Sequence, residues 1–177
     1  QAGFDAAWEI DFWGRFRRGI EAADANLSAT VADYQNALVS LTAEVARTYV
    51  IIRTLEERLV IAADNIKLQS DSLRIANVRF TNGATTELDV QQAVANLSET
   101  KAQVPALRQA LRQAKNGLSI LLGKPPSELT DILGEPGTIP VAPAHLAVGV
   151  PAELLRRRPD VQLAEMQAAT QSALVGV

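Results

Sequence analysis

Few side chains in this sequence have the types and spacing that catalysis requires. The chain contains no cysteine and one histidine, His145, which lies in a proline-rich stretch. These counts exclude a thiolate nucleophile, a disulfide framework and a Cys/His zinc site. Carboxylates such as Glu44, Glu56 and Glu57 are scattered, without a nucleophile and base, a ligand cluster or a phosphate loop. We predict no enzyme, no cofactor and no metal, and expect these carboxylates to form solvated helix surface.

The charge balance argues against one class of partner. The chain has 17 Lys and Arg against 20 Asp and Glu, for a net charge of −3, and both signs are interspersed. No basic field exists that would bind nucleic acid by counterion release. Hydrophobic residues make up 47% of the chain but aromatic residues only 5%. This composition suits helices packed through Ala, Leu and Val better than a globular core.

The most informative polar residues surround a turn. Asn82 and Gly83 tolerate the left-handed conformation that closes a helix. Thr86, followed three residues later by Asp89, forms a capping-box pattern that begins the next helix. The chain is therefore predicted to reverse direction here. For Asp89, a role as a helix cap explains the pattern at least as well as a functional role.

A heptad pattern on each side predicts the elements that carry this turn. Mostly apolar residues recur every seven positions in two rows before the turn and two rows after it. The rows are Leu27, Tyr34, Leu41, Thr48, Leu55, Ala62, Gln69, Ala76 and Val31, Leu38, Val45, Ile52, Leu59, Ile66, Leu73, Phe80, then Val90, Leu97, Val104, Leu111, Leu118 and Ala93, Thr100, Leu107, Ala114, Leu121. Such a repeat is typical of long helices packed with left-handed supercoiling. The fold class is therefore mainly α, a long antiparallel coiled-coil hairpin.

Two prolines mark the later part of the chain. Pro105 lies inside the return helix, where we expect a bend near residues 101–105 without loss of the helix. Residues 125–151 are rich in Pro and Gly and predict an irregular connector. Pro159 suits the first position of a further helix, with Asp160 in its first turn. This helix, about residues 159–174, is a candidate to cover the part of the long helix that the shorter return helix leaves uncovered.

The N-terminal stretch alternates apolar and polar residues. Phe4, Ala6, Trp8, Ile10 and Phe12 share one face of a period-two strand, and acidic residues lie on the other face. From the pattern alone, a half-buried strand of a soluble protein is somewhat favoured over a strand of a transmembrane barrel.

The residues after this strand and the start of the chain add further expectations. Arg15, Arg17 and Arg18 follow the break at Gly14 and are predicted to be a solvated helix start. No signal peptide and no run of 18 apolar residues is visible. We therefore expect either a cytosolic protein or a piece of a larger one.

Four segments in order resemble the TolC-like outer-membrane efflux channels, in particular the lipoprotein subgroup that works with RND-type pumps. They are residues 8–15 (WEIDFWGR), residues 79–83 with 87–93 (RFTNG and ELDVQQA), residues 118–125 (LSILLGKP) and residues 154–161 (LLRRRPDV). Members of this family have two tandem repeats and more than twice this length. The chain therefore resembles a first-repeat fragment.

The resemblance implies a division of the chain. It implies a transmembrane β-barrel strand over residues 1–14, a periplasmic helical hairpin over 15–122, an equatorial connector over 123–158 and the start of a second-repeat helix over 159–177. The expected setting is the outer membrane and its lipids, with a periplasmic extension. Implied partners are two further copies in a homotrimer, a periplasmic adaptor protein and an inner-membrane RND-type pump.

The resemblance also implies roles for named residues. The tip residues Asn82, Gly83, Ala84 and Thr85 would dock the adaptor, and Asp89, beside Thr86, would join polar links that keep the periplasmic entrance closed. Arg156, Arg157, Arg158, Pro159 and Asp160 would form an equatorial motif. The implied function is a passive exit duct for drugs, metal ions or other small solutes. An alternative is a structural or adaptor coiled-coil hairpin, but the two half-lipoyl segments that flank an adaptor hairpin are not recognisable here.

Overall fold

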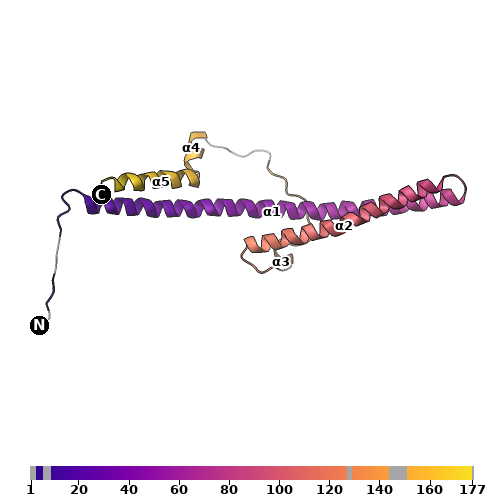
Figure 1. Cartoon of the computed structure of the whole chain (residues 1–177), viewed down its shortest axis with the longest axis horizontal. Coiled ribbons are helices and arrows are strands. Elements are labelled where there is room, and N and C mark those ends of the chain that lie inside the picture. Colours follow the sequence, from indigo (N-terminus) through magenta and orange to yellow (C-terminus); the bar gives the residue numbers. More distant parts are fainter. Residues whose placement is uncertain (1–2, 6–8, 127–128, 144–150, 177) are drawn as a thin grey trace. The chain divides into compact units, whose positions relative to one another are not determined.

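The computed structural model describes residues 3–5, 9–126, 129–143 and 151–176, and these residues are mainly helical, as predicted (Figure 1). The elements are α1 Arg15–Thr81, α2 Glu87–Leu121, α3 Thr130–Leu133, α4 Pro151–Arg156 and α5 Pro159–Leu174. With 67 and 35 residues, α1 and α2 are ~100 Å and ~53 Å long at ~1.5 Å per residue. No helix in these ranges combines the length and the apolar character needed to cross a membrane.

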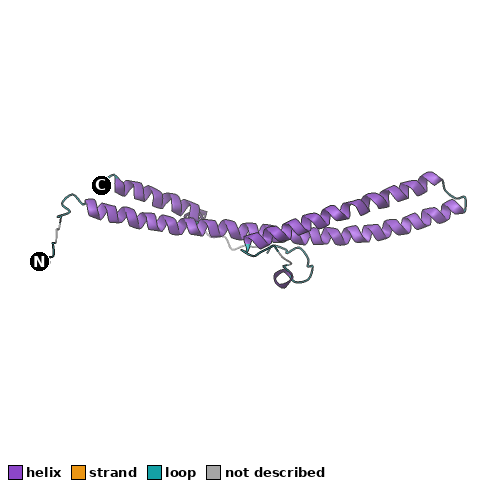
Figure 2. Cartoon of the chain, turned by 60° about the horizontal axis from the view of Figure 1, so that its bottom comes forward, coloured by secondary structure: helices purple, strands orange, loops and turns teal. Residues whose placement is uncertain are grey.

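The N-terminal strand is not formed in the described residues. Residues 3–5 and 9–13 have no strand structure (Figure 2), and the predicted strand residues Ala6 and Trp8 lie outside the described ranges. Phe4 and Phe12 are fully or largely exposed. The physical reason is that a strand needs a neighbouring strand for its backbone hydrogen bonds, and the described part of the chain supplies none.

The chain separates into two compact units, and α1 contributes to both. The unit of residues 42–142 holds the hairpin, in which α1 and α2 run side by side in opposite directions (Figures 1 and 2). Here the predicted heptad rows are buried or half-buried from Val45 to Ala76 on α1 and from Val90 to Leu121 on α2. The heptad pattern therefore identified the packed face of this unit.

The base of the hairpin carries the main hydrophobic cluster. Ile52 and Leu118 are buried there with Leu129 and Leu133 of the following segment. The chain therefore folds back after α2 and seals the end of the helix pair. Pro105 lies inside α2 and does not end it, as expected.

The second unit joins residues 1–41 to residues 143–177, and here the predicted heptad residues are exposed. The expected seam residues Leu27, Val31 and Tyr34 are 65%, 51% and 68% exposed. Within residues 15–41 of α1 the buried residues are instead Ala22, Ala29 and Ala32, and Ala173 of α5 is also buried. Alanines give a helix a flat surface that a second helix can approach closely, so α5 covers this face and leaves the larger residues uncovered.

Candidate functional site at the hairpin tip

The end of α1 is closed by the residues that the sequence marked as the tip. Gly83 has φ +72°, a conformation that costs glycine little. The N–H groups of Gly83 and Ala84 donate to the carbonyls of Phe80 and Arg79, at 2.9 and 2.8 Å. The Asn82 side chain donates to the Val78 carbonyl at 2.8 Å. The last carbonyls of α1 are thus satisfied within the turn, and the chain reverses over a few residues.

The start of α2 is organised by one carboxylate. Asp89 accepts hydrogen bonds from the backbone N–H and the hydroxyl of Thr86, at 3.1 and 3.0 Å, and from the hydroxyl of Thr85. The Thr85 hydroxyl, followed by the two Thr86 donors, lowers the pKa of Asp89 below its ordinary value of 3.8. We call Thr85, Thr86 and Asp89 the Asp89 cluster. All three bonds go to Oδ2, so within the described chain Oδ1 accepts no hydrogen bond.

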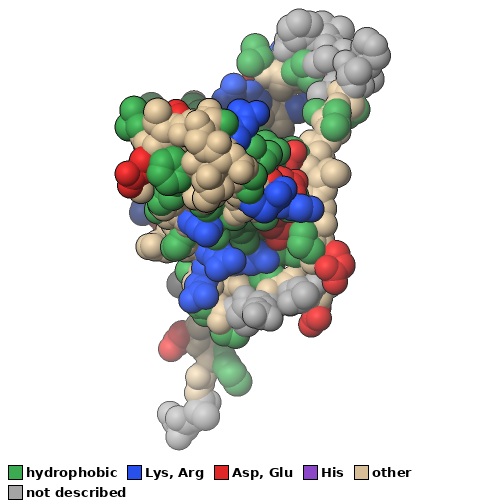
Figure 3. All heavy atoms as spheres, turned by 90° about the vertical axis from the view of Figure 1, so that its right-hand side faces the viewer, with side chains coloured by type: hydrophobic (Ala, Val, Ile, Leu, Met, Phe, Trp, Pro, Cys, Tyr) green, Lys and Arg blue, Asp and Glu red, His purple; other side chains and the backbone are tan. Residues whose placement is uncertain are grey.

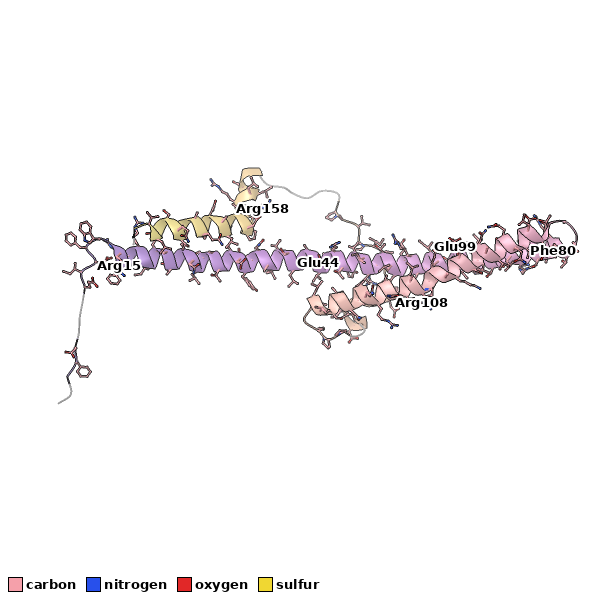
Figure 4. All side chains as sticks on the ribbon, in the orientation of Figure 1. Arg15, Glu44, Phe80, Glu99, Arg108 and Arg158 are labelled. Atoms are coloured by element: carbon pink, nitrogen blue, oxygen red, sulfur yellow. The ribbon has the colours of Figure 1, made fainter. Side chains whose placement is uncertain are left out.

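A hollow of about 410 Å³ lies beside this cluster. It is lined by Ser72, Ile75, Ala76 and Arg79 of α1 and by Thr85 and Asp89. Figure 4 shows Phe80 at this end of the hairpin, and Leu88 is 75% exposed. Seen from the hairpin end, basic, acidic and hydrophobic side chains are mixed (Figure 3). The tip therefore offers a carboxylate, a guanidinium and apolar side chains together, which suits contact with another protein surface.

The predicted equatorial motif lies in the other compact unit, which holds residues 143–177. Arg158 donates two hydrogen bonds to Asp160, from Nε at 3.0 Å and Nη2 at 2.7 Å. The Arg158 guanidinium lowers the pKa of the Asp160 carboxyl. Pro159 begins α5, as predicted, and Figure 4 shows Arg158 near the junction of α4 and α5. Arg156 and Arg157 are exposed.

A second polar cluster at the base of the hairpin was missed by sequence reasoning. Arg53 of α1 is only 4% exposed. Its Nε donates to the Tyr49 hydroxyl at 3.2 Å, and its Nη1 donates to Glu56 at 2.8 Å. Glu56 also pairs with Lys115 of α2 at 3.3 Å. The hydrogen bond to Tyr49, followed by that to Glu56, raises the pKa of Arg53 above its ordinary value. We call these four residues the Arg53 cluster.

The Arg53 cluster attaches the connector to the helices. The guanidinium donates to the carbonyl of Glu135 at 3.0 Å and to the carbonyl of Leu133. A side chain at Gly137 would approach the guanidinium carbon at 3.4 Å. The connector backbone therefore passes close to a buried cation that donates hydrogen bonds to two of its carbonyl oxygens.

The position of Glu56 corrects an expectation. It was predicted to be solvated surface, but it is 8% exposed and lies between two cations. Glu44 and Glu57 are exposed, as expected. A local signal was present, since Tyr49, Arg53 and Glu56 lie on one side of a helix at spacings of four and three residues. Their connector partners are some 80 residues away, and no local pattern indicates such contacts.

Neither cluster has the composition of a metal site. Three or more His, Cys, Asp or Glu side chains do not converge anywhere in residues 3–5, 9–126, 129–143 and 151–176. His145 lies outside these residues. What the described clusters supply is ionic and hydrogen-bonding contact.

Comparison with protein families gives one match over most of the chain. The family described as "Outer membrane efflux protein" matches residues 1–124. A similar protein is "Nodulation protein T" of Rhizobium leguminosarum bv. trifolii, 30% identical over 97% of this chain and 36% of that protein. Another is "Pyoverdine export outer membrane protein OpmQ" of Pseudomonas putida, 34% identical over 99% of this chain and 37% of that protein.

Solved structures give the same picture. The outer-membrane channel OprN is 40% identical and superposes with a TM-score of 0.90 over 96% of this chain and 38% of its own chain. CusC is 25% identical, with a TM-score of 0.77 over 96% of this chain and 39% of its own. The chain thus spans less than two fifths of the length of these proteins.

Proposed function

Because the chain belongs to the outer membrane efflux protein family, we propose that it forms part of the wall of an exit duct through which small solutes leave the cell. Its relatives are outer-membrane proteins, and so is this one. The observation that carries the proposal is the family match over residues 1–124, which includes the whole hairpin. The family is one of channels and not of enzymes, so the duct conducts passively.

The exposed side of α1 supports a wall made of several hairpins. Leu27, Val31 and Tyr34 are large seam residues that are more than half exposed in the described chain. Heptad seams of this kind pack against further helices. We propose that the neighbours come from the rest of the polypeptide and from two further copies of it, in a homotrimer.

The tip is proposed to serve as the docking and gating end of the duct. Asn82, Gly83, Ala84 and Thr85 would contact a periplasmic adaptor protein. Asp89 would use its unoccupied Oδ1 for a polar link to the second hairpin, while Oδ2 caps α2. A carboxylate has about four acceptor sites, so both roles are compatible.

The ends of the chain take the remaining proposed roles. Residues 1–14 would form a strand only beside neighbouring strands, which explains why residues 3–5 and 9–13 have no strand structure here. Residues 123–158 would form the equatorial part, and the motif of Arg156 to Asp160 would lie where this part meets the next helix.

An inner-membrane RND-type pump would drive the flow, and the solutes would be drugs, metal ions or other small molecules. Relatives include the "Solvent efflux pump outer membrane protein SrpC" of Pseudomonas putida, and we take such small solutes as the substrate class.

Conductance of the full-length protein in planar bilayers tests this function. The proposal expects discrete ionic currents, and it expects that deleting the gene increases sensitivity to at least one solute. A protein that binds adaptor and pump but carries no current would instead fit the alternative of a structural hairpin.

A further inference from the structure

The turn into α1 groups arginines and aromatic rings that the proposed function does not use. Arg15, Arg17 and Arg18 lie in the first turn of α1, and no acidic residue accompanies them there. Figure 4 shows Arg15 at the start of this helix. The rings of Phe12 and Trp13 meet edge to face at 5.9 Å and are 80% and 90% exposed. Cationic and aromatic groups are thus presented side by side.

The three arginines do not stabilise the start of α1. A helix N-terminus carries partial positive charge, so three arginines in the first turn are unfavourable, and the single Asp11 carboxylate offsets only part of their charge. Asp11 caps the backbone by accepting from the N–H groups of Phe16 and Arg17, at 3.2 and 3.1 Å. The backbone N–H groups at the helix end are therefore partly satisfied by Asp11, and the groups that remain able to bind an anion are the guanidinium groups.

The three arginines differ in their ion pairs. Arg18 pairs with Glu21 at 2.7 Å. Arg17 is 3.6 Å from the Asp11 carboxylate, with 78% of its side chain exposed. Arg15 makes no ion pair with any residue in the described ranges. Two guanidinium groups are therefore largely available.

Beside them is a hollow of about 380 Å³, lined by Trp13, Gly14, Arg17, Arg18 and Glu21. We propose that this hollow, together with Arg15, binds the phosphate of an acidic phospholipid at the membrane surface, with Phe12 and Trp13 lying among the lipid chains. Arginine forks match phosphate oxygens, aromatic rings favour the membrane interface, and anionic lipid attracts basic residues near its surface.

The apolar surroundings indicate a lipid and not dissolved phosphate. Ile10, Phe16 and Ile20 are 68%, 51% and 63% exposed around the arginines. Free phosphate would use the arginines alone and leave this apolar surface in water, whereas a lipid covers both. The inference rests on the proposed function only in placing this turn at a membrane.

The test measures how much phosphatidylglycerol the full-length protein retains in detergent, by native mass spectrometry, with phosphatidylcholine as the neutral comparison. Replacing Arg15, Arg17 and Arg18 together by Gln should lower the apparent affinity for phosphatidylglycerol about tenfold, since each arginine near an anionic surface contributes to binding. The matched control replaces three exposed arginines of the same helix, Arg47, Arg58 and Arg74, by Gln and should change nothing. Triple Lys replacement at the site should keep most of the binding, and circular dichroism verifies that all variants are folded.

Equal retention by the site variant and the native protein would overturn the inference, as would an equal loss in the control. Competition by inorganic phosphate, combined with no effect of Trp13→Leu, would assign the site to free phosphate and also overturn it. Conductance measured in phosphatidylcholine bilayers keeps the proposals apart. Normal conductance without lipid preference contradicts this inference alone, and lipid preference without conductance contradicts the proposed function alone.

Discussion

The Arg53 cluster and the Asp89 cluster lie in the same hairpin and use the same kinds of bonds, yet they are built in opposite ways. Every bond of the Asp89 cluster joins residues three or four positions apart, and all of them are exposed. The Arg53 cluster joins α1 to α2 and to connector carbonyls about 80 residues away, and Arg53 and Glu56 are buried. The first cluster shapes the chain locally and stays exposed. The second uses its bonding capacity to hold the fold together.

The largest effect should come from Arg53→Met. This variant removes four hydrogen bonds and leaves Glu56 buried with one cation, so we expect the free energy of unfolding to fall by ~3 kcal/mol. Amide exchange in residues 129–137 should become faster. Thermal unfolding and hydrogen exchange measure both changes.

The matched control for this variant is Arg58→Met, which removes an exposed arginine of the same helix and should change stability little. Adding Glu56→Met to Arg53→Met should recover part of the loss, because an apolar pair can replace a buried ion pair. Unchanged exchange in residues 129–137 would show that Arg53 does not hold the connector.

Pro105→Ala changes the part of α2 that lies between the two clusters. Alanine restores a backbone N–H and removes a poor helix former, so stability should rise by up to ~3 kcal/mol. If a bend at Pro105 helps the duct wall to curve, conductance of the full-length protein should change as well. Greater heat stability with unchanged conductance would leave the proline with a structural role only.

Lys115→Met should have a smaller effect than either change above. Lys115 is one third exposed and contributes the outer ion pair of Glu56, at 3.3 Å. We expect a loss of at most ~1 kcal/mol in the free energy of unfolding, because solvent screens this pair. Guanidinium chloride titration measures it, with Lys101→Met, on an exposed part of α2, as the control. A loss of stability as large as that of Arg53→Met would mean that Lys115, and not Arg53, contributes most to the stability of the cluster.

The contrast between the clusters explains what the sequence could and could not predict. The helices, the turn at Gly83 and the capping pattern of Thr86 and Asp89 depend on residues close in sequence, so their patterns indicated them. The burial of Glu56 depends on where the connector returns. The covered face of α1 near Ala29 depends on which helix packs there. Heptad periodicity identifies an apolar row but does not say which face meets a neighbour from the same chain.

Asp89→Ala should affect stability less than the changes at the Arg53 cluster, because the Asp89 cluster is exposed. If Oδ1 links to the second hairpin, ion conductance of the full-length protein should rise more clearly than its melting temperature falls. Asp89→Asn keeps part of the capping ability and loses the charge, so it should raise conductance with a smaller loss of melting temperature. Planar-bilayer recordings and thermal unfolding of both variants give the comparison. Native conductance in both, with only lower thermal stability, would make Asp89 a cap and nothing more.

The smallest effect should be that of acid on the tip. The folded-state pKa of Asp89 lies below its ordinary value of 3.8, chiefly because the Thr85 hydroxyl and then the Thr86 donors stabilise the carboxylate. A group with a depressed pKa contributes stability that is complete above its unfolded pKa and is lost as the pH falls through its folded pKa. Amide exchange at residues 86–90, corrected for the intrinsic effect of pH, should therefore be independent of pH at neutrality and speed up only below about pH 4. Asp89→Asn should abolish this acid dependence, since the amide does not titrate. Exchange at residues 86–90 that accelerates equally in the native protein and in Asp89→Asn would assign the acid effect to other carboxylates and remove the evidence that Asp89 alone organises the start of α2.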